Sequence, residues 1–175
     1  MGHSEIRTES SVRLPVSIEP GVAVRTAGLP RTSNKKGFIM EYLVGVVLAL
    51  AVSIGATLVG ADRERTFYPT VLIVVATYYA LFAVLAGSTH ALMSEAIPIV
   101  LFIVVAIAGF RRGLWWAAAG LVGHGIFDLL HGHVIFNPGV PAWWPGWCLS
   151  YDLTAGGYLG FLLWRSKVNN RPDGR

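Results

Sequence analysis

Five long apolar stretches, almost free of charged residues, are the feature that most limits what this chain can fold into. The first contains 20 residues without a charge, and at about 1.5 Å per helical residue it can cross a hydrocarbon core of roughly 30 Å. Because lipid offers the backbone no hydrogen-bond partners, such stretches are expected to be helical. The five stretches are residues 42–61, 67–87, 91–110, 114–131 and 147–164. The pattern predicts an all-α fold, a polytopic membrane helix bundle with five transmembrane helices.

The amino-acid composition excludes several classes of protein. Charged residues make up 14% of the 175 residues and hydrophobic residues 54%, whereas a soluble domain carries roughly 25% charged residues. An ordinary cytosolic globule and a disordered chain are therefore excluded. The pI near 9.5 rests on a net charge of only +4, so we expect the lipid bilayer, and no nucleic acid, as partner. One cysteine, Cys148, allows neither an intramolecular disulfide nor a cysteine-based zinc finger.

The sequence divides into three parts. Residues 1–37 contain prolines, serines and threonines without a sustained apolar period, and they cannot bury enough apolar surface to offset the entropy of ordering. We interpret them as a disordered polar tail, or as sequence upstream of a true start at Met40. Residues 38–166 form the predicted five-helix transmembrane domain, and residues 167–175 form a short basic cytoplasmic tail.

The basic residues predict the orientation of the bundle. If five helices cross the membrane in turn, all eight basic residues after residue 40 lie on one side of it, and the loops on the other side have none. They are Arg63, Arg65, Arg111, Arg112, Arg165, Lys167, Arg171 and Arg175. Since cytoplasmic loops are rich in Lys and Arg, the pattern predicts a multi-pass protein of the cell (plasma or inner) membrane with its C-terminus in the cytoplasm. This orientation places the six basic residues of the N-terminal tail outside the cytoplasm, contrary to the same rule.

Polar residues on the fourth stretch are spaced to share one helix face. His124, Asp128 and His131 are four and three residues apart, which places them within about 60° of one another on a helix. Ala117 and Gly120 continue this face, and small residues allow a neighbouring helix to approach closely. The face is therefore expected to contact protein rather than lipid, with His124 and His131 as the partners of Asp128. A hydrogen-bonded pair that only fixes helix packing is the structural alternative.

Other polar residues are expected at the same end of the bundle by connectivity alone. His90 lies in the turn before the third stretch, Glu95 in the first turn of that helix, and Asp152 in the first turns of the fifth helix. A divalent metal such as zinc is the possible cofactor, with His124, His131, His90 and Asp128 as candidate ligands. Asp128, Asp152 and Glu95 are candidate catalytic residues. For Glu95 and Asp152, a favourable position near a helix N-terminus is the alternative.

Two segments resemble a known family. Residues 62–73 with 78–83 form the first segment, and the second comprises residues 123–128, 137–141, 143–145 and 151–152. Together they resemble a family of small, uncharacterised bacterial multi-pass membrane proteins, over about residues 40–165. The resemblance implies a fold and a location in the bacterial inner membrane but no activity. The His and Asp residues are also similar to those of intramembrane zinc hydrolases of the alkaline ceramidase and progestin-receptor type, which have seven helices and a different His spacing.

Four functions remain open at this point, and the sequence does not decide whether the protein is an enzyme. The first is a His/Asp pocket in the outer half of the bundle that handles a small ligand or protons. The second is a metal-dependent lipid hydrolase, in which Asp128 or Asp152 activates a bound water. The third is a haem protein with His90 and His131 as axial ligands. The fourth is a structural subunit of a homo-oligomer or larger membrane complex.

Overall fold

The computed structural model describes residues 35–165, 167 and 168, and all secondary structure in them is helical. The elements are α1 (Lys35–Val59), the short 3-10 helix η1 (Ala61–Arg63), α2 (Phe67–Leu85), α3 (Thr89–Arg112), α4 (Leu114–Val134) and α5 (Trp144–Trp164). The prediction of an all-α membrane helix bundle with five helices is confirmed. Most of the two predicted tails, residues 1–34 and 169–175, lies outside the described residues, and α1 begins at Lys35, inside the first of them.

Three of the helices are long and apolar enough to cross a membrane. These segments are Ile39–Val59, Phe67–Leu85 and Thr89–Arg112. Helices α4 and α5 have 21 residues each, but they carry four of the five His, Asp and Glu residues of the apolar stretches. Those residues are buried inside the bundle, for example His124 in α4 and Asp152 in α5. The low hydropathy of α4 and α5 therefore reflects polar side chains that face protein.

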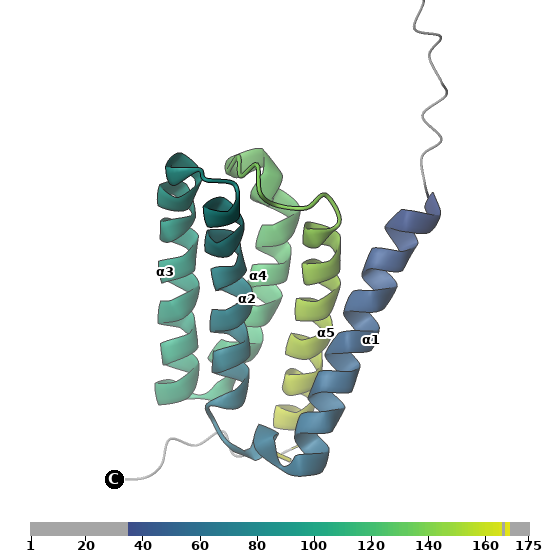
Figure 1. Ribbon diagram of the computed structural model, residues 1–175. Helices are drawn as coiled ribbons and strands as arrows, with labels where there is room; N and C mark the ends of the chain where they lie inside the picture. The colour runs from purple at the N-terminus through teal and green to yellow at the C-terminus, as the bar shows by residue number, and fades with distance from the viewer. Residues whose placement is uncertain (1–34, 166, 169–175) are drawn as a thin grey trace, which may run out of the picture. The chain divides into compact units, whose positions relative to one another are not determined.

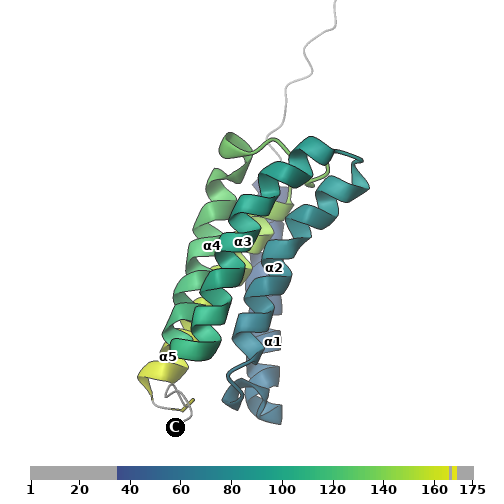
Figure 2. The ribbon, with the colours of Figure 1, turned by 90° about the vertical axis from the view of Figure 1, so that its left-hand side faces the viewer.

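Helix α5 lies between two neighbours, and its position organises the bundle (Figure 1). It packs against α1 on one side and α4 on the other, and α4 in turn contacts α3 and α2. Helices α2 and α3 pack against each other as an antiparallel pair, seen from the side in Figure 2. As a result, α4 and α5 share the most protected interface of the bundle.

Local sequence explains where several helices begin and end. Gly60 and Gly87 follow α1 and α2 with φ of 79° and 64°, a left-handed conformation that glycine adopts without the steric cost of a Cβ. Ser88 caps α3, because its side chain accepts a hydrogen bond from the N–H of Ala91 at 3.2 Å. Helix α5 begins at Trp144, earlier than the predicted residue 147, because Pro145 is tolerated in a first turn, where its missing N–H is not needed.

Small residues allow the helices to approach closely, as predicted for Ala117 and Gly120. A Cβ added to Gly120 would lie 2.5 Å from the Leu72 side chain and 2.8 Å from Val105. On α1, a Cβ added to Gly45 would collide with Ser150 Oγ and with the backbone carbonyl of Trp147. The contact between α1 and α5 therefore depends on the absence of a side chain at position 45.

We predict that Gly45→Ala destabilises the protein by about 1–3 kcal/mol, because the Trp147 carbonyl belongs to the helix backbone and cannot rotate away. Thermal unfolding in detergent measures the change. Gly55→Ala is the matched control, since Gly55 lies on the same helix with no atom within 4 Å of an added Cβ. Equal melting temperatures for the two variants would show that α1 does not depend on this contact.

Candidate functional site

Helix α4 turns its polar face into the bundle. His124, Asp128 and His131 are 1%, 1% and 2% exposed, so the predicted common face is confirmed. His124 lies ten residues after Leu114, about 15 Å along the helix axis, and is therefore near the middle of α4. The polar residues reach the bundle centre rather than only its outer half.

Four of the buried side chains form a compact group, called here the four-donor cluster: His124, Asp128, Cys148 and Asp152. One potential ligand atom from each lies within 4.8 Å of the other three. His124 Nδ1 is 2.7 Å from Asp152 Oδ2 and 3.4 Å from Asp128 Oδ2. The Cys148 thiol donates to Asp152 Oδ2 at 3.5 Å, and its sulfur is 4.0 Å from His124 Nδ1. A single imidazole nitrogen therefore stands between two carboxylates.

Cys148 belongs to this group although the sequence analysis did not propose it as a ligand. The signal that could have identified it is the four-residue spacing between Cys148 and Asp152, which places both on one face of a helix. The predicted fifth helix, residues 147–164, already contains both residues. In the structure α5 begins at Trp144, so Cys148 lies on its second turn, opposite His124.

Tyr79 of α2 connects the four-donor cluster to a second polar group. Its hydroxyl donates a hydrogen bond to Asp128 Oδ1 at 2.5 Å, and its ring stacks on that of His131 with centroids 4.0 Å apart. The neighbouring Tyr78 is 37% exposed and packs against Trp144. Of these two adjacent tyrosines, only Tyr79 therefore points into the bundle.

The second polar group, called here the Glu95 cluster, consists of Glu95, His131 and Asn137. His131 Nε2 lies 2.8 Å from Glu95 Oε1, to which the Asn137 amide also donates at 2.9 Å. The same amide donates to the carbonyl of Tyr79 at 3.0 Å. The expected pairing of Asp128 with both histidines of its own helix is thus replaced: Asp128 contacts His124, but His131 pairs with Glu95 across the helix interface.

The helix boundaries change the interpretation of both acidic residues. Because α3 begins at Thr89 and α5 at Trp144, Glu95 lies in the second turn of α3 and Asp152 in the third turn of α5, not in the first turns. The helix dipole acts mainly within the first turn, and both carboxylates are completely buried with histidine partners. A favourable helix N-terminus does not account for them.

His90, one of the four candidate metal ligands, lies apart from both clusters. It is exposed near the start of α3, and its backbone carbonyl accepts a hydrogen bond from Ser94. His133 is also exposed, as expected for a residue two positions after His131. The structure therefore brings together His124, Asp128 and Asp152, places His131 and Glu95 beside them, and leaves His90 outside.

Both clusters contain carboxylate oxygens without a hydrogen-bond donor. Among the described residues, Asp128 Oδ2, Asp152 Oδ1 and Glu95 Oε2 are buried and accept no hydrogen bond. If both aspartates of the four-donor cluster are ionised and His124 is protonated, the group carries a net charge of −1. A buried charge is costly unless it is paired. The geometry therefore provides a place for an additional positive charge.

No protein-family model, no curated protein and no solved structure matches this chain. The resemblance to small bacterial multi-pass membrane proteins stays a prediction, and the function must be argued from the geometry of the clusters.

We predict that Tyr79→Phe destabilises the protein by about 1–3 kcal/mol, because it leaves the buried Asp128 Oδ1 without its hydroxyl donor. The remaining phenyl ring can still stack on His131. Thermal or denaturant unfolding in detergent is the measurement. Tyr78→Phe removes a hydroxyl from the adjacent, exposed residue and should leave stability within about 0.5 kcal/mol of the parent. Equal effects of the two changes would contradict a structural role for the Tyr79–Asp128 bond.

Proposed function

We propose that this integral membrane protein binds a divalent transition metal ion, with zinc as the best match, in the four-donor cluster. The observation that carries this proposal is the convergence of four metal-ligating atoms, from α4 and α5, to within 4.8 Å of one another in the bundle interior. The ligands are His124 Nδ1, Cys148 Sγ and one carboxylate oxygen each from Asp128 and Asp152.

The distances between the donor atoms fit a tetrahedral ion. Zinc lies about 2.0–2.1 Å from nitrogen and oxygen ligands and about 2.3 Å from sulfur, so tetrahedral ligands are roughly 3.3–3.8 Å apart. The separations of 3.4 and 3.5 Å lie within this range, and the 4.0 Å between Cys148 Sγ and His124 Nδ1 is slightly longer. Only the 2.7 Å hydrogen bond between His124 and Asp152 is too short, and it would lengthen when a metal replaces the proton.

Charge balance also supports a divalent cation. Two ionised aspartates, a metal-binding Cys148 thiolate and a neutral imidazole carry a charge of −3, of which a divalent ion offsets two. The mixture of nitrogen, sulfur and carboxylate donors favours zinc or a similar borderline ion over magnesium or calcium, which prefer oxygen ligands. The carboxylate oxygens without donors, Asp128 Oδ2 and Asp152 Oδ1, supply the acceptor lone pairs that such an ion needs.

The four protein ligands favour a site that stores or passes on the metal ion over a site that catalyses hydrolysis. Catalytic zinc usually has three protein ligands and an open position for water, whereas four protein ligands close the site. His124, Asp128, Cys148 and Asp152 are all at most 1% exposed. The three cavities described for the structure are lined by other residues. The lipid hydrolase therefore has less support. The haem alternative lacks its two axial histidines, because His90 is exposed and His131 Nε2 is paired with Glu95.

Proton transfer is a second candidate function, favoured by the bridging position of Tyr79. Hydrogen bonds and close contacts run from Asp152 through His124 and Asp128 to the Tyr79 hydroxyl. The Tyr79 ring also stacks on His131, which is paired with Glu95, but this stacking contact itself transfers no proton. Metal binding to His124 Nδ1 or to Cys148 releases protons, so such a chain would also suit a metal site. Proton transfer alone needs no metal, and metal content distinguishes the two functions.

We further propose that all five helices cross a bacterial inner membrane, with the C-terminus in the cytoplasm. The described basic residues support this orientation, because η1, the end of α3 and the end of α5 lie at the same end of the bundle (Figure 1). They are Arg63, Arg65, Arg111, Arg112, Arg165 and Lys167. A homo-oligomer or a larger membrane complex stays a prediction.

We predict that the purified protein binds one equivalent of zinc per chain, measured by elemental analysis after incubation with the metal and desalting. Asp152→Asn and His124→Gln each remove a ligand and should abolish stoichiometric binding. His90→Gln is the matched control, since His90 is an exposed histidine outside the cluster, and it should bind zinc like the parent. A chelator should lower the melting temperatures of the parent and of His90→Gln but not those of the two ligand variants, because a ligand stabilises the state that binds it.

Cobalt provides a direct test of the sulfur ligand. Bound Co²⁺ should show a thiolate-to-metal charge-transfer band that Cys148→Ser abolishes, while the conservative change keeps the protein folded. If the parent binds no metal and its melting temperature is indifferent to chelators, the metal proposal is wrong and proton transfer becomes the better explanation of the clusters.

We predict from the distribution of basic residues that reporter fusions at residues 88 and 140 lie outside the cytoplasm, and that fusions at residue 112 and at the C-terminus lie inside it. Paired reporters that are active on opposite sides of the membrane measure each position. A cytoplasmic signal at residue 140 would contradict the five-helix orientation.

A further inference from the structure

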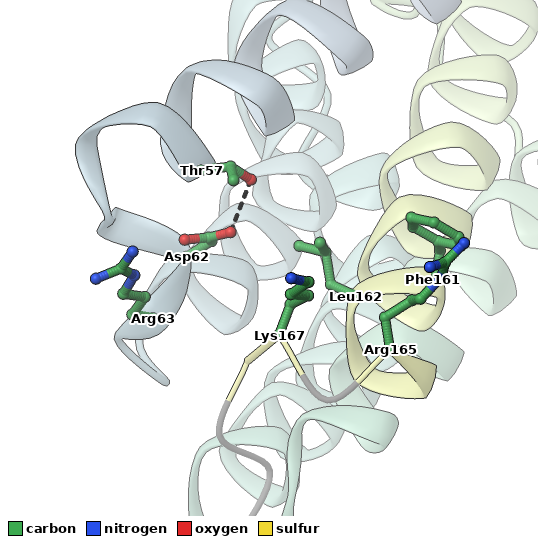
Figure 3. A pocket seen from close by; sticks show the side chains of 7 residues that line it. All are labelled: Thr57, Asp62, Arg63, Phe161, Leu162, Arg165 and Lys167. Carbon is green, nitrogen blue, oxygen red and sulfur yellow. Dashed lines mark hydrogen bonds between the residues drawn. The ribbon is translucent and has the colours of Figure 1, made fainter.

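The end of the bundle that carries the basic residues contains a cavity of about 460 Å³ that the metal proposal does not use. It is lined by Thr57, Asp62, Arg63, Phe161, Leu162, Arg165 and Lys167 (Figure 3). We propose that this cavity binds the phosphate of an anionic phospholipid headgroup. Its volume is within the range of about 300–1,000 Å³ that is usual for small-ligand sites. The proposal is independent of the metal site.

Three cationic side chains from two segments line the cavity: Arg63 comes from η1, and Arg165 and Lys167 come from the stretch after α5. Lys167 lies between Arg63, which follows α1 on η1, and Arg165, which follows α5 (Figure 3). No ion pair joins these three side chains to a carboxylate in the described part of the chain. Arginine and lysine bind phosphate oxygens through charge-assisted hydrogen bonds. The cavity therefore offers positive charge that the protein itself does not neutralise.

The one acidic residue of the lining has a structural role. Asp62 is only 3% exposed, and its Oδ2 accepts a hydrogen bond from the Thr57 hydroxyl at 2.7 Å. The Thr57 hydroxyl also lies 3.0 Å from that of Tyr158 on α5. This chain connects α1, η1 and α5 and holds the wall of the cavity in place. Three basic side chains against one acidic side chain leave a net charge of +2 in the lining.

Backbone contacts fix the basic residues that follow α5. The N–H of Arg165 donates to the Phe161 carbonyl, and that of Lys167 donates to the Leu162 carbonyl, both at 3.0 Å. The Arg165 guanidinium lies over the Phe161 ring, 5.2 Å from its centroid. These hydrogen bonds fix the backbone of Arg165 and Lys167 at the end of the helix, and the Phe161 ring holds the Arg165 guanidinium.

The location of the cavity favours a lipid over a free anion. It lies where the membrane span of α1 ends at Val59, and phospholipid phosphates are found at this depth, just outside the hydrocarbon core. Phe161 and Leu162 supply an apolar wall beside the basic groups. A phospholipid offers a phosphate to the cations and an acyl chain to this wall, whereas inorganic phosphate offers only the first.

The test compares two variants that lose the same charge from the same end of the bundle. Arg63→Gln with Arg165→Gln removes two cations of the cavity, and Arg111→Gln with Arg112→Gln removes two exposed arginines in the last turn of α3 that do not line it. Binding of phosphatidylglycerol and of phosphatidylcholine to the full chain in detergent is measured by native mass spectrometry and by the rise in melting temperature.

We expect the parent and the Arg111/Arg112 variant to bind phosphatidylglycerol in preference to phosphatidylcholine. The Arg63/Arg165 variant should bind phosphatidylglycerol roughly tenfold more weakly or worse. Lys167→Gln, a change outside the helices, should weaken binding in the same direction and serves if the double variant does not fold. Equal losses in the two double variants would overturn the proposal, because they would indicate diffuse attraction. Stabilisation by inorganic phosphate and none by phosphatidylglycerol would overturn the lipid assignment.

Discussion

The buried contact between His124 and Asp152, 2.7 Å across the interface of α4 and α5, is the interaction on which the rest of the structure depends. Inside a bundle of low dielectric constant, an imidazole and a carboxylate attract strongly, and loss of either leaves the other buried without its partner. This contact fixes which faces of α4 and α5 meet. Since α1 packs on α5, and α2 and α3 pack on α4, the remaining helices are arranged around this pair.

Such a polar contact requires that the two helices come unusually close. An added Cβ at Gly125 would lie 3.1 Å from the Leu149 carbonyl and 3.2 Å from Asp152 Cβ, and at Gly156 it would lie 3.0 Å from the Ala118 carbonyl. Between membrane helices, close packing through small residues is a main source of association. The glycines therefore set a short distance between the helices, and at this distance the polar side chains can contact one another.

The sequence predicted the parts of this arrangement that depend on local periodicity. The apolar stretches identified five helices, and the spacing of His124, Asp128 and His131 identified the inward face of α4. Partners on other helices could not be derived in this way, because the pairing of His131 with Glu95 depends on how α3 and α4 pack. Asp152 was expected in the first turns of a helix that begins at residue 147, whereas α5 begins at Trp144 and Asp152 lies in its third turn. The contact of Cys148 with His124 depends on how α4 and α5 pack, which local periodicity does not predict.

The two polar clusters differ in the balance of donors and acceptors, and this difference separates their roles. In the Glu95 cluster, two groups, His131 and Asn137, converge on a single oxygen of one carboxylate. In the four-donor cluster, two carboxylates compete for one imidazole nitrogen, with only the Tyr79 hydroxyl and the Cys148 thiol as additional donors. A deficit of donors in a buried site is relieved by a cation, which accepts lone pairs from all four groups at once. Glu95 Oε1 already has two hydrogen-bond partners, His131 and Asn137, while Glu95 Oε2 has none among the described residues. We therefore propose the metal for the interface of α4 and α5, where the four ligand atoms converge, and proton exchange for the Glu95 cluster, with Tyr79 in contact with both.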